Sequence, residues 1–458
     1  MRAVIRSVAA AALLCAAGTV GWFAMVPPEL IRVGAGYSAK IVCSNVFLAG
    51  RDPDQVLADD VQAPGHPLLK LMQVKVDREA RMVRAGLFGF WGARTAIARG
   101  GLGCTVLPEG IVPAALADRQ AAMPVPAAPS PVLWPEGEQV EVSGDQALAK
   151  ILDDLAMTGP GMRAVVVVRD GRIVAERYGE GFSAGTRLLG WSMTKTVTAA
   201  LVGMLVREGK LSVDKKQLFQ AWRADGRADI TLAELMGMSS GLAFNEDYGD
   251  VTDVTRMLFL EKDMAGFAAA KPLTAPVDTA FSYSSGTTLL ISRVWQEAVG
   301  DPQAALAWPS EKLFGPLGMA SAVLEPDAAG TLVGSSYLYA TARDWARFGQ
   351  FLLQDGEWNG EPVLPAGYAA WMREPVAASD GSYGRGQLWL RGPRSTKAQD
   401  VALGVPGDTF WLIGHDGQST AIIPSLRLVV VRMGLTPERL GYKPQAMVGA
   451  LAKVLGQD

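Results

Sequence analysis

The stretch that most constrains the fold of this chain is residues 190–211, GWSMTKTVTAALVGMLVREGKL. From residue 199 to 206 it is apolar on almost every side, which is typical of a helix enclosed by a core. Its first turn nevertheless carries Ser192 and Lys195. Burying a lysine without a partner is costly or removes its proton. The stretch therefore predicts a large core with a reactive amine inside it.

The three-residue spacing of Ser192 and Lys195 puts both side chains on one face of a helix, where the amine can take the serine proton. Apolar surroundings would lower the lysine pKa toward the range of a working base. The chain repeats this spacing at Ser212 and Lys215, but there it follows Gly209 in the polar run LSVDKKQ. We expect the second pair to form a surface turn without chemistry.

Residues 237–241, GMSSG, match a competing motif, the G-x-S-x-G of α/β-hydrolases. That motif needs a strand directly before the serine and a helix after it. Here a helix is predicted before Ser239, because Thr231 and Glu234 have the spacing of a capping box. Such a triad would also need His415 as its base. A turn at the end of a helix is the better interpretation.

Two other segments place polar side chains beside apolar runs. In FSYSSGTT (281–288), Tyr283 and Ser285 offer a phenol for proton transfer and a hydrogen-bonding hydroxyl. In GHDGQ (414–418), His415 and nearby backbone N–H groups can face a carbonyl oxygen. Each segment has an ordinary alternative: Tyr283 as a partly buried aromatic residue, and Asp-Gly as a hairpin turn.

The composition limits the classes of function. A chain of 458 residues predicts two or three structural units, and 49% hydrophobic with 19% charged residues indicates a folded protein. A net charge of −3 gives no electrostatic reason to expect a nucleic acid as partner. Two histidines exclude a multi-histidine metal centre, and a Cys/His zinc site would also need nearly all three cysteines. We expect no metal and no organic cofactor.

The N-terminal segment, residues 1–28, carries Arg2 and Arg6 and then no charge from Ser7 to Pro28. About 20 uncharged residues suffice to span a bilayer as a helix. Cleavage after the small residues that follow Cys15 is the alternative, and the length favours an uncleaved anchor. We expect the rest of the chain to be exported to the periplasm and anchored to the inner membrane.

Export changes the interpretation of the cysteines. With Cys15 in the targeting segment, Cys43 and Cys104 remain as a pair in an oxidising compartment. A disulfide between them would close a loop of about 60 residues, worth roughly 4 kcal/mol in the chain-entropy description. Two unpaired buried thiols are the alternative.

The remaining chain divides into three parts. Residues 30–112 predict a small β-rich or mixed extension, and residues 113–137 predict a Pro/Ala-rich linker. Residues 138–458 begin with the amphipathic helix GDQALAKILDDLAMTG and a hairpin that turns at Asp170-Gly171. Central helices, closing strands and a last helix near 443–456 follow. This order predicts an α+β domain whose antiparallel sheet is built from both ends, with a mostly helical insertion beside it.

The order of motifs carries a resemblance. Ser-x-x-Lys, then Tyr-x-Ser about 90 residues on, then His-x-Gly about 130 beyond, resembles the β-lactamase and penicillin-recognising serine hydrolase superfamily. Within it, the 6-aminohexanoate-dimer hydrolases and related esterases of the class C-like group are most similar. The resemblance covers roughly residues 145–457 and includes LAELMGMSSGL and YATARDWARFGQFLLQDGEWNG. It implies a β-lactamase-like α+β fold, preceded by the N-terminal extension of exported members.

The resemblance also implies roles for individual residues. Ser192 would be the acylated nucleophile, and Lys195 and Tyr283 would share the work of general base and acid. The backbone N–H groups of Ser192 and Gln418 would form the oxyanion hole. Ser285 stands in the substrate site where many relatives carry asparagine.

His415 and Gly417 occupy the place of the Lys-Thr-Gly motif of β-lactamases, so a permanent positive charge that holds a substrate carboxylate is missing. This difference weakens an antibiotic-hydrolysing role and favours small esters or linear amides. The loops 244–250 and 382–389 are expected substrate walls. Their aromatic residues suit substrate contact and ordinary rim packing equally well: Tyr248, Tyr383 and Trp389.

The sequence therefore predicts an exported serine hydrolase that cleaves a small-molecule ester or amide through an acyl-enzyme. A peptidoglycan D,D-peptidase or D-aminopeptidase is one alternative. A non-catalytic binding module of the same fold is another. The oligomeric state is not predicted.

Overall fold

The computed structural model describes residues 27–63, 65–107 and 132–456. Most of the expected anchor (residues 1–26) and most of the expected linker (residues 113–131) lie outside the described residues. Among the helices of the described part, none is long and apolar enough to cross a bilayer.

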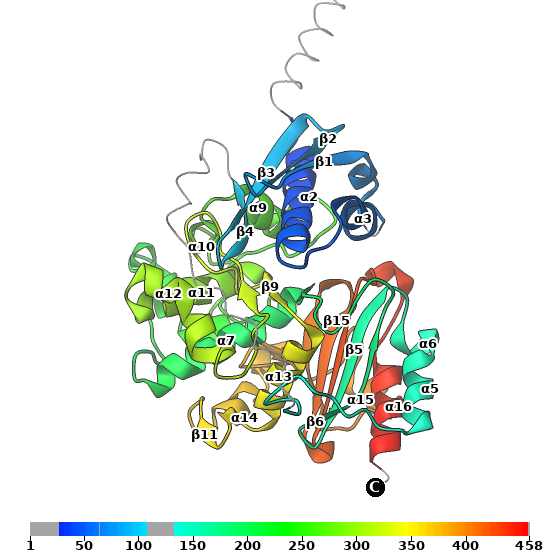
Figure 1. Ribbon diagram of the computed structural model, residues 1–458. Helices are drawn as coiled ribbons and strands as arrows, with labels where there is room; N and C mark the ends of the chain where they lie inside the picture. The colour runs from blue at the N-terminus through cyan, green and yellow to red at the C-terminus, as the bar shows by residue number, and fades with distance from the viewer. Residues whose placement is uncertain (1–26, 64, 108–131, 457–458) are drawn as a thin grey trace, which may run out of the picture.

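The first unit is one long helix packed on a four-stranded antiparallel sheet, with short helical turns at one side (Figure 1). Its helices are α2 (Glu29–Phe47), α3 (Pro53–Val56), η1 (Leu57–Gln62) and η2 (Pro67–Leu71). Its strands, in sheet order, are β1 (Met72–Asp77), β2 (Met82–Leu87), β3 (Trp91–Arg99) and β4 (Gly103–Leu107).

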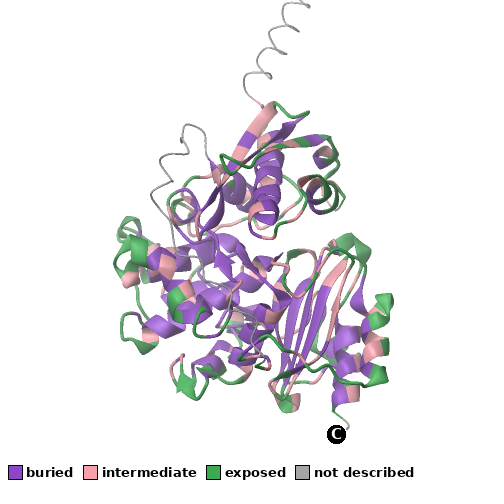
Figure 2. Cartoon of the chain, in the orientation of Figure 1, coloured by how far each residue is buried: buried purple, intermediate pink, exposed green. Residues whose placement is uncertain are grey.

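A disulfide joins the C-terminal part of α2 to β4 in this unit. Cys43 and Cys104 are both fully buried and have a Cα–Cα distance of 6.0 Å. The structure therefore contains the pairing expected from the number and context of the cysteines. Figure 2 shows that most of α2 is buried, because the sheet covers one side and the second unit covers another.

The second unit is built around a seven-stranded antiparallel sheet in the order β12-β13-β14-β15-β16-β5-β6. The strands are β5 (Met162–Arg169), β6 (Arg172–Tyr178), β12 (Tyr383–Gly384), β13 (Leu388–Trp389), β14 (Phe410–Gly414), β15 (Gln418–Ile423) and β16 (Leu428–Gly434). The predicted hairpin is confirmed, because β5 and β6 pair with Arg169 opposite Arg172. The sheet joins strands from both ends of the domain through the β16–β5 pair, as expected.

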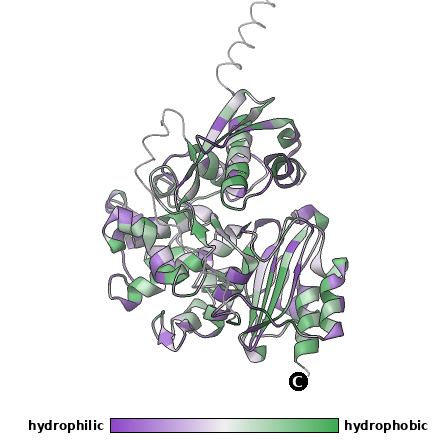
Figure 3. Cartoon of the chain, viewed as in Figure 1, coloured by the Kyte–Doolittle hydropathy of each residue, from purple (hydrophilic) through white to green (hydrophobic). Residues whose placement is uncertain are grey.

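Helices cover both faces of this sheet. One face packs against α5 (Gln146–Asp153) and α16 (Gln445–Leu455), whose largely apolar surface is visible in Figure 3. The other face packs against α13 (Ala342–Leu353) and the helical subdomain. That subdomain contains α7 (Thr194–Arg207), α8 (Leu232–Met236), α9 (Asp253–Leu260), α10 (Met264–Ala269), α11 (Ser285–Val299) and α12 (Pro302–Pro309).

Short elements complete the unit. A small three-stranded sheet has the order β7 (Leu188–Leu189), β9 (Leu338–Ala340), β8 (Val323–Leu324). A two-stranded ribbon is formed by β10 (Glu357–Trp358) and β11 (Glu361–Pro362), and two short helices are α14 (Tyr368–Met372) and α15 (Lys397–Ala402).

One expected helix is divided into two in the structure. GDQALAKILDDLAMTG forms two helices, α5 and α6 (Leu155–Thr158), rather than one. Asp154 between them has extended backbone angles, and its carboxylate accepts a hydrogen bond from the backbone N–H of Ala156. An aspartate that caps a new helix competes with continuing the old one.

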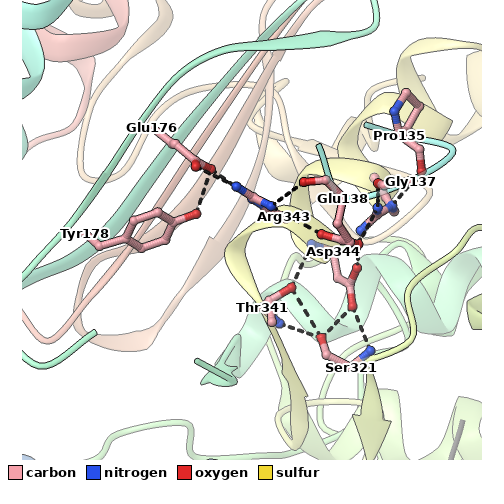
Figure 4. Close-up of polar contacts among 10 residues, drawn as sticks. Pro135, Gly137, Glu138, Glu176, Tyr178, Ser321, Thr341, Arg343 and Asp344 are labelled. Atoms are coloured by element: carbon pink, nitrogen blue, oxygen red, sulfur yellow. Dashed lines mark hydrogen bonds and ion pairs between the residues drawn. The ribbon is translucent and has the colours of Figure 1, made fainter. Parts of the chain in front are cut away.

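Two arginines of α13 fix the segment that enters the second unit. Arg343 donates to Glu176 of β6 at 2.6 Å and to the carbonyl of Glu138 at 2.8 Å. The neighbouring Asp344 accepts from the Ser321 backbone at 2.9 Å (Figure 4). Arg347 donates to the carbonyl of Gly137 at 2.7 Å. These bonds tie the entering chain, the sheet edge and α13 together.

The two units meet through a buried carboxylate. Glu325, which follows β8, accepts hydrogen bonds from Ser44 at 2.8 Å, from the backbone N–H of Cys104 at 2.6 Å, and from Lys40. Glu325 is fully buried. Gly103 has φ +64°, and a Cβ there would lie 2.4 Å from the carboxylate. Glycine is therefore needed where β4 meets the carboxylate.

Candidate active site

Ser192 lies in a 3-10 turn, Trp191–Met193, directly before α7, and Lys195 is the second residue of that helix. Because residues three apart are neighbours on one face of a helical segment, the two side chains meet. The Lys195 ammonium nitrogen donates to the Ser192 hydroxyl at 3.0 Å, to the Ser285 hydroxyl at 3.0 Å and to the Ser335 carbonyl at 3.2 Å. The expected Ser192–Lys195 contact is present.

Burial changes the pKa of Lys195. Lys195 is 1% exposed, and burial lowers its pKa from 10.5 to about 8, against the opposing attraction of Glu246. The free amine is therefore accessible near neutral pH. α7 is buried from Thr194 to Leu205, so the apolar helix predicted from the sequence supplies the desolvation.

Glu246 is a site residue that the sequence analysis did not single out, although its loop was expected to form a substrate wall. Its carboxylate accepts from the Ser285 hydroxyl at 2.5 Å, from the Ser285 backbone N–H at 2.7 Å and from Tyr248 at 3.2 Å. Ser285 thus links Lys195 to a half-buried carboxylate. Nothing in the loop sequence FNEDYGD distinguishes Glu246 from its acidic neighbours Asp247 and Asp250.

Tyr283 lies close to Lys195 and Ser192, the expected nucleophile. The Lys195 nitrogen lies 4.8 Å from the centre of the Tyr283 ring, and the nearby Ser192 hydroxyl acts to lower the pKa of its phenol. Burial and the nearby Glu246 raise the pKa of Tyr283. The neutral phenol is therefore the favoured form, and it can donate a hydrogen bond or a proton at the reacting centre. Lys195 is the better base of the two.

The aromatic residues expected in the second wall pack around Tyr283. Tyr383, on β12, meets the Tyr283 ring edge-on at 5.9 Å, and Trp389, on β13, lies 5.3 Å from it. Phe281 contacts both Tyr383 and Trp389. Tyr383 is fully buried and Trp389 is partly buried. These rings hold Tyr283 in place.

The turn between β14 and β15 lies against the turn that bears Ser192. Gly414 packs so closely on Gly190 that a Cβ would lie 2.3 Å from the Gly190 carbonyl oxygen. Gln418 stands opposite Gly414 at the start of β15, and β15 contacts the turn that holds Ser192. The backbone segments of the two expected oxyanion donors, Ser192 and Gln418, are therefore neighbours.

The Gln418 side chain stabilises this turn from inside. It is buried, accepts from the Gly434 backbone N–H at 2.8 Å and donates to the His415 carbonyl at 3.1 Å. Gly417 has φ +87°, and a Cβ there would lie 2.8 Å from Arg432. Gly417 therefore shapes the turn through its backbone.

His415 stands at the rim of the site. Its imidazole stacks on Tyr248 with ring centres 4.8 Å apart and meets Trp191 edge-on at 5.6 Å. Trp191 has φ +47°, a left-handed conformation that costs a bulky residue about 1–3 kcal/mol. Such strain is typical of residues next to a reacting group.

The competing motifs are placed elsewhere. Ser239 follows α8 with no strand before it, and its hydroxyl donates to Asp278 at 2.9 Å. The capping box at Thr231 is confirmed. Ser212 and Lys215 lie exposed in a turn, as expected. Among the described residues, no group of three or more His, Cys, Asp or Glu side chains is arranged to hold a metal ion.

The family model for Beta-lactamase matches residues 148–441, well over half of the chain. The chain belongs to the β-lactamase family, and its β-lactamase-like fold is the one expected from the sequence. The first unit, residues 27–107 as described, lies outside the match.

Individual relatives agree with this assignment. The 6-aminohexanoate-dimer hydrolase of Paenarthrobacter ureafaciens is 24% identical over 57% of this chain and 71% of that protein. A candidate 6-aminohexanoate-dimer hydrolase structure from Bacillus anthracis has a TM-score of 0.55 at 24% identity, over 67% of this chain and 81% of its own. EstCE1, a hydrolase with promiscuous acyltransferase activity, has a TM-score of 0.51 at 17% identity, over 66% and 98%.

Proposed function

We propose that this protein is a serine hydrolase that cleaves ester or linear amide bonds through an acyl-enzyme on Ser192. The observation that carries the proposal is the Lys195 nitrogen 3.0 Å from the Ser192 hydroxyl, inside a core that lowers the lysine pKa to about 8. A buried amine at that distance is a base in contact with its nucleophile.

In acylation, neutral Lys195 takes the Ser192 proton while the serine oxygen attacks the substrate carbonyl carbon. The backbone N–H groups of Ser192 and Gln418 stabilise the oxyanion. When the carbon–oxygen or carbon–nitrogen bond breaks, the Tyr283 phenol passes a proton to the leaving group and recovers one from Lys195. Water then attacks the acyl-enzyme with Lys195 again as base. The proton passes from Lys195 to the Ser192 oxygen as the bond to the acyl group breaks and the acid leaves.

The substrate class follows from the rim. His415 provides no permanent positive charge where β-lactamases hold a carboxylate with lysine, so an uncharged ester or a linear amide suits the site better than a β-lactam. The similarity to a 6-aminohexanoate-dimer hydrolase supports the linear amide. The similarity to EstCE1 is one of fold.

The test compares purified wild type with Ser192→Ala on p-nitrophenyl acetate, a linear 6-aminohexanoate dimer and nitrocefin. We expect hydrolysis of the ester or the dimer, an acyl adduct on Ser192 by mass spectrometry, and loss of both in the variant. Ser212→Ala is the matched control, because it removes the serine of the second Ser-x-x-Lys. Wild-type rates in Ser192→Ala with no adduct would refute the proposal.

We also propose that the enzyme is exported and anchored to the inner membrane by residues 1–28. The support is the uncharged run from Ser7 to Pro28 after Arg2 and Arg6, together with a disulfide, which is rare in the cytosol. Membrane fractionation with N-terminal sequencing tests it. A mature chain that begins near Gly18, or recovery in the cytosolic fraction, would contradict the anchor.

A further inference from the structure

A cavity of about 420 Å³ lies between the first unit and the rim of the active site. On the side of the second unit it is bordered by Trp191, Tyr248 and His415. These are the three rings that contact one another beside the nucleophile. Trp191 precedes Ser192 in the chain, and Tyr248 donates to Glu246. The cavity therefore adjoins the turn that bears Ser192 and the loop that bears Glu246.

The opposite wall comes from the first unit and is apolar. Val33 of α2 and Leu68 and Leu69 of η2 line it, and Phe259 of α9 closes the side between the two units. Val33, Leu69 and Phe259 are buried, and Leu68 is half-buried. Gly34 also faces the cavity, where a Cβ would lie 2.8 Å from the end of Met72.

Most of the charged residues around the cavity lie on its solvent-exposed side, whereas Asp416 is a half-buried part of the lining. Asp250, Glu438 and Arg439 are all exposed. Arg439 donates to the carbonyl of Ala63 at 3.4 Å, so the second unit reaches the end of η1 across the opening. The cavity thus has a polar entrance and an apolar interior.

The wall from the first unit is held firmly in place. Lys40 and Ser44 of α2 bond to the buried Glu325 of the second unit. Asp60 of η1 accepts a hydrogen bond from Arg163 of β5 at 2.6 Å. The helices α2 and α9 pack side by side (Figure 1). A wall fixed by buried ion pairs is a preformed binding surface rather than a loose flap.

We propose that this cavity binds the linear hydrocarbon chain of an ester whose carbonyl group is attacked by Ser192, so that the first unit selects medium-chain substrates. The inference rests on the proposed hydrolase function. The volume of the cavity lies within the roughly 300–1,000 Å³ that is typical of small-molecule sites. Such sites are mostly apolar with a few polar groups. The cavity shares three rings with the rim, and one of them, Trp191, directly precedes Ser192 in the chain; this shared wall is the reason for placing the chain of a Ser192 substrate there.

The size of the effect follows from burial of the chain. Each buried methylene contributes about 0.8 kcal/mol, so kcat/KM is expected to rise up to about four-fold per added methylene until the cavity is full. The assay measures kcat/KM for p-nitrophenyl acetate, butyrate, hexanoate and octanoate. A second series, methyl to octyl acetate, distinguishes a chain on the acyl side from one on the alcohol side. A rise in either series supports the proposal, and a flat or falling profile in both overturns it.

Two leucines of η2 provide a matched pair of variants. Leu68 lines the cavity, whereas Leu71, three residues on, is 47% exposed and lies outside the lining. We expect Leu68→Asp to lower the octanoate-to-acetate ratio of kcat/KM at least ten-fold, and Leu71→Asp to leave that ratio unchanged. Leu68→Trp, which fills the cavity with an apolar side chain, should lower the ratio too. Because this variant introduces no charge, a lower ratio in it cannot be due to unfolding of the turn by aspartate.

Failure of this inference is distinguishable from failure of the proposed function. If ester hydrolysis disappears in Ser192→Ala but the Leu68 variants keep the wild-type ratio, the hydrolase stands and the cavity is not its chain site. If Ser192→Ala retains wild-type hydrolysis of acetate, the proposed function itself fails.

Discussion

Replacing Glu246 with glutamine tests the electrostatics of the site most directly. The Ser285 hydroxyl bridges Lys195 and Glu246 through bonds of 3.0 and 2.5 Å, so the amine nitrogen and the carboxylate oxygen are at most about 5.5 Å apart. The carboxylate receives hydrogen bonds from three donors, two of them from Ser285 and one from Tyr248. Burial raises the pKa of Glu246, and the charge of Lys195 and these donors oppose that shift. In its ionised form the carboxylate favours the ammonium form of Lys195.

The magnitude follows from that separation. Two unit charges about 5.5 Å apart interact with about 3 kcal/mol at an effective dielectric constant of about 20. This energy corresponds to about two pKa units. Removing the negative charge should therefore lower the Lys195 pKa from about 8 to about 6. Because Lys195 acts as a base in its neutral form, kcat/KM rises with pH through this pKa, and the midpoint of the rise moves down with it.

The assay is the pH profile of kcat/KM for p-nitrophenyl acetate between pH 5 and 10, corrected for spontaneous hydrolysis. We expect a midpoint near 8 in wild type and about two units lower in Glu246→Gln. Asp247→Asn is the control, because it removes the same charge from the exposed neighbour in the loop. An unshifted midpoint in Glu246→Gln, or an equal shift in Asp247→Asn, would refute the coupling of Glu246 to Lys195.

Three other predictions concern stability. Because the unfolded chain holds the Lys195 proton with a pKa of 10.5 and the folded protein with one of about 8, wild type should gain about 3 kcal/mol relative to Lys195→Met between pH 8 and 10.5. Denaturant curves at several pH values measure this difference, and parallel pH dependence would contradict it. Lys40→Met leaves the buried Glu325 carboxylate without its ion-pair partner and should lower the free energy of unfolding by about 3–5 kcal/mol. Adding Glu325→Leu should recover most of the loss in thermal unfolding, and a double variant no better than the single one would count against the ion pair. Replacing Cys43 and Cys104 with alanine should destabilise the protein by about 4 kcal/mol, since the bond spans 61 residues; an unchanged melting temperature is the contrary result.

Local patterns predicted the elements whose cause is local. The Asp170-Gly171 turn forms its hairpin with φ of +50° and +77° at its two residues, as the dipeptide favours. Thr231 and Glu234 form their capping box. The split between α5 and α6 was missed, because Asp154 suits a helix surface and a helix cap equally well in the sequence, and only its backbone angles distinguish them.

α2 was not predicted, for a different reason. Its sequence carries Gly34 and Gly36, which weaken helix propensity. In the folded protein Gly36 faces the backbone of Phe259, where a Cβ would lie 2.7 Å from the carbonyl oxygen. Close packing against the second unit needs the glycine and stabilises the helix.

The sequence by itself determined the reactive pair and its setting. A serine and a lysine three residues apart at the start of an apolar helix must meet and must be buried, since short-range geometry and hydrophobicity require both. Only the tertiary structure decided that Glu246 acts on Lys195 through Ser285, and that the first unit walls a cavity at the rim of the site. These contacts join segments from about 40 to nearly 400 residues apart, and the pairing of such distant groups depends on how the whole core packs.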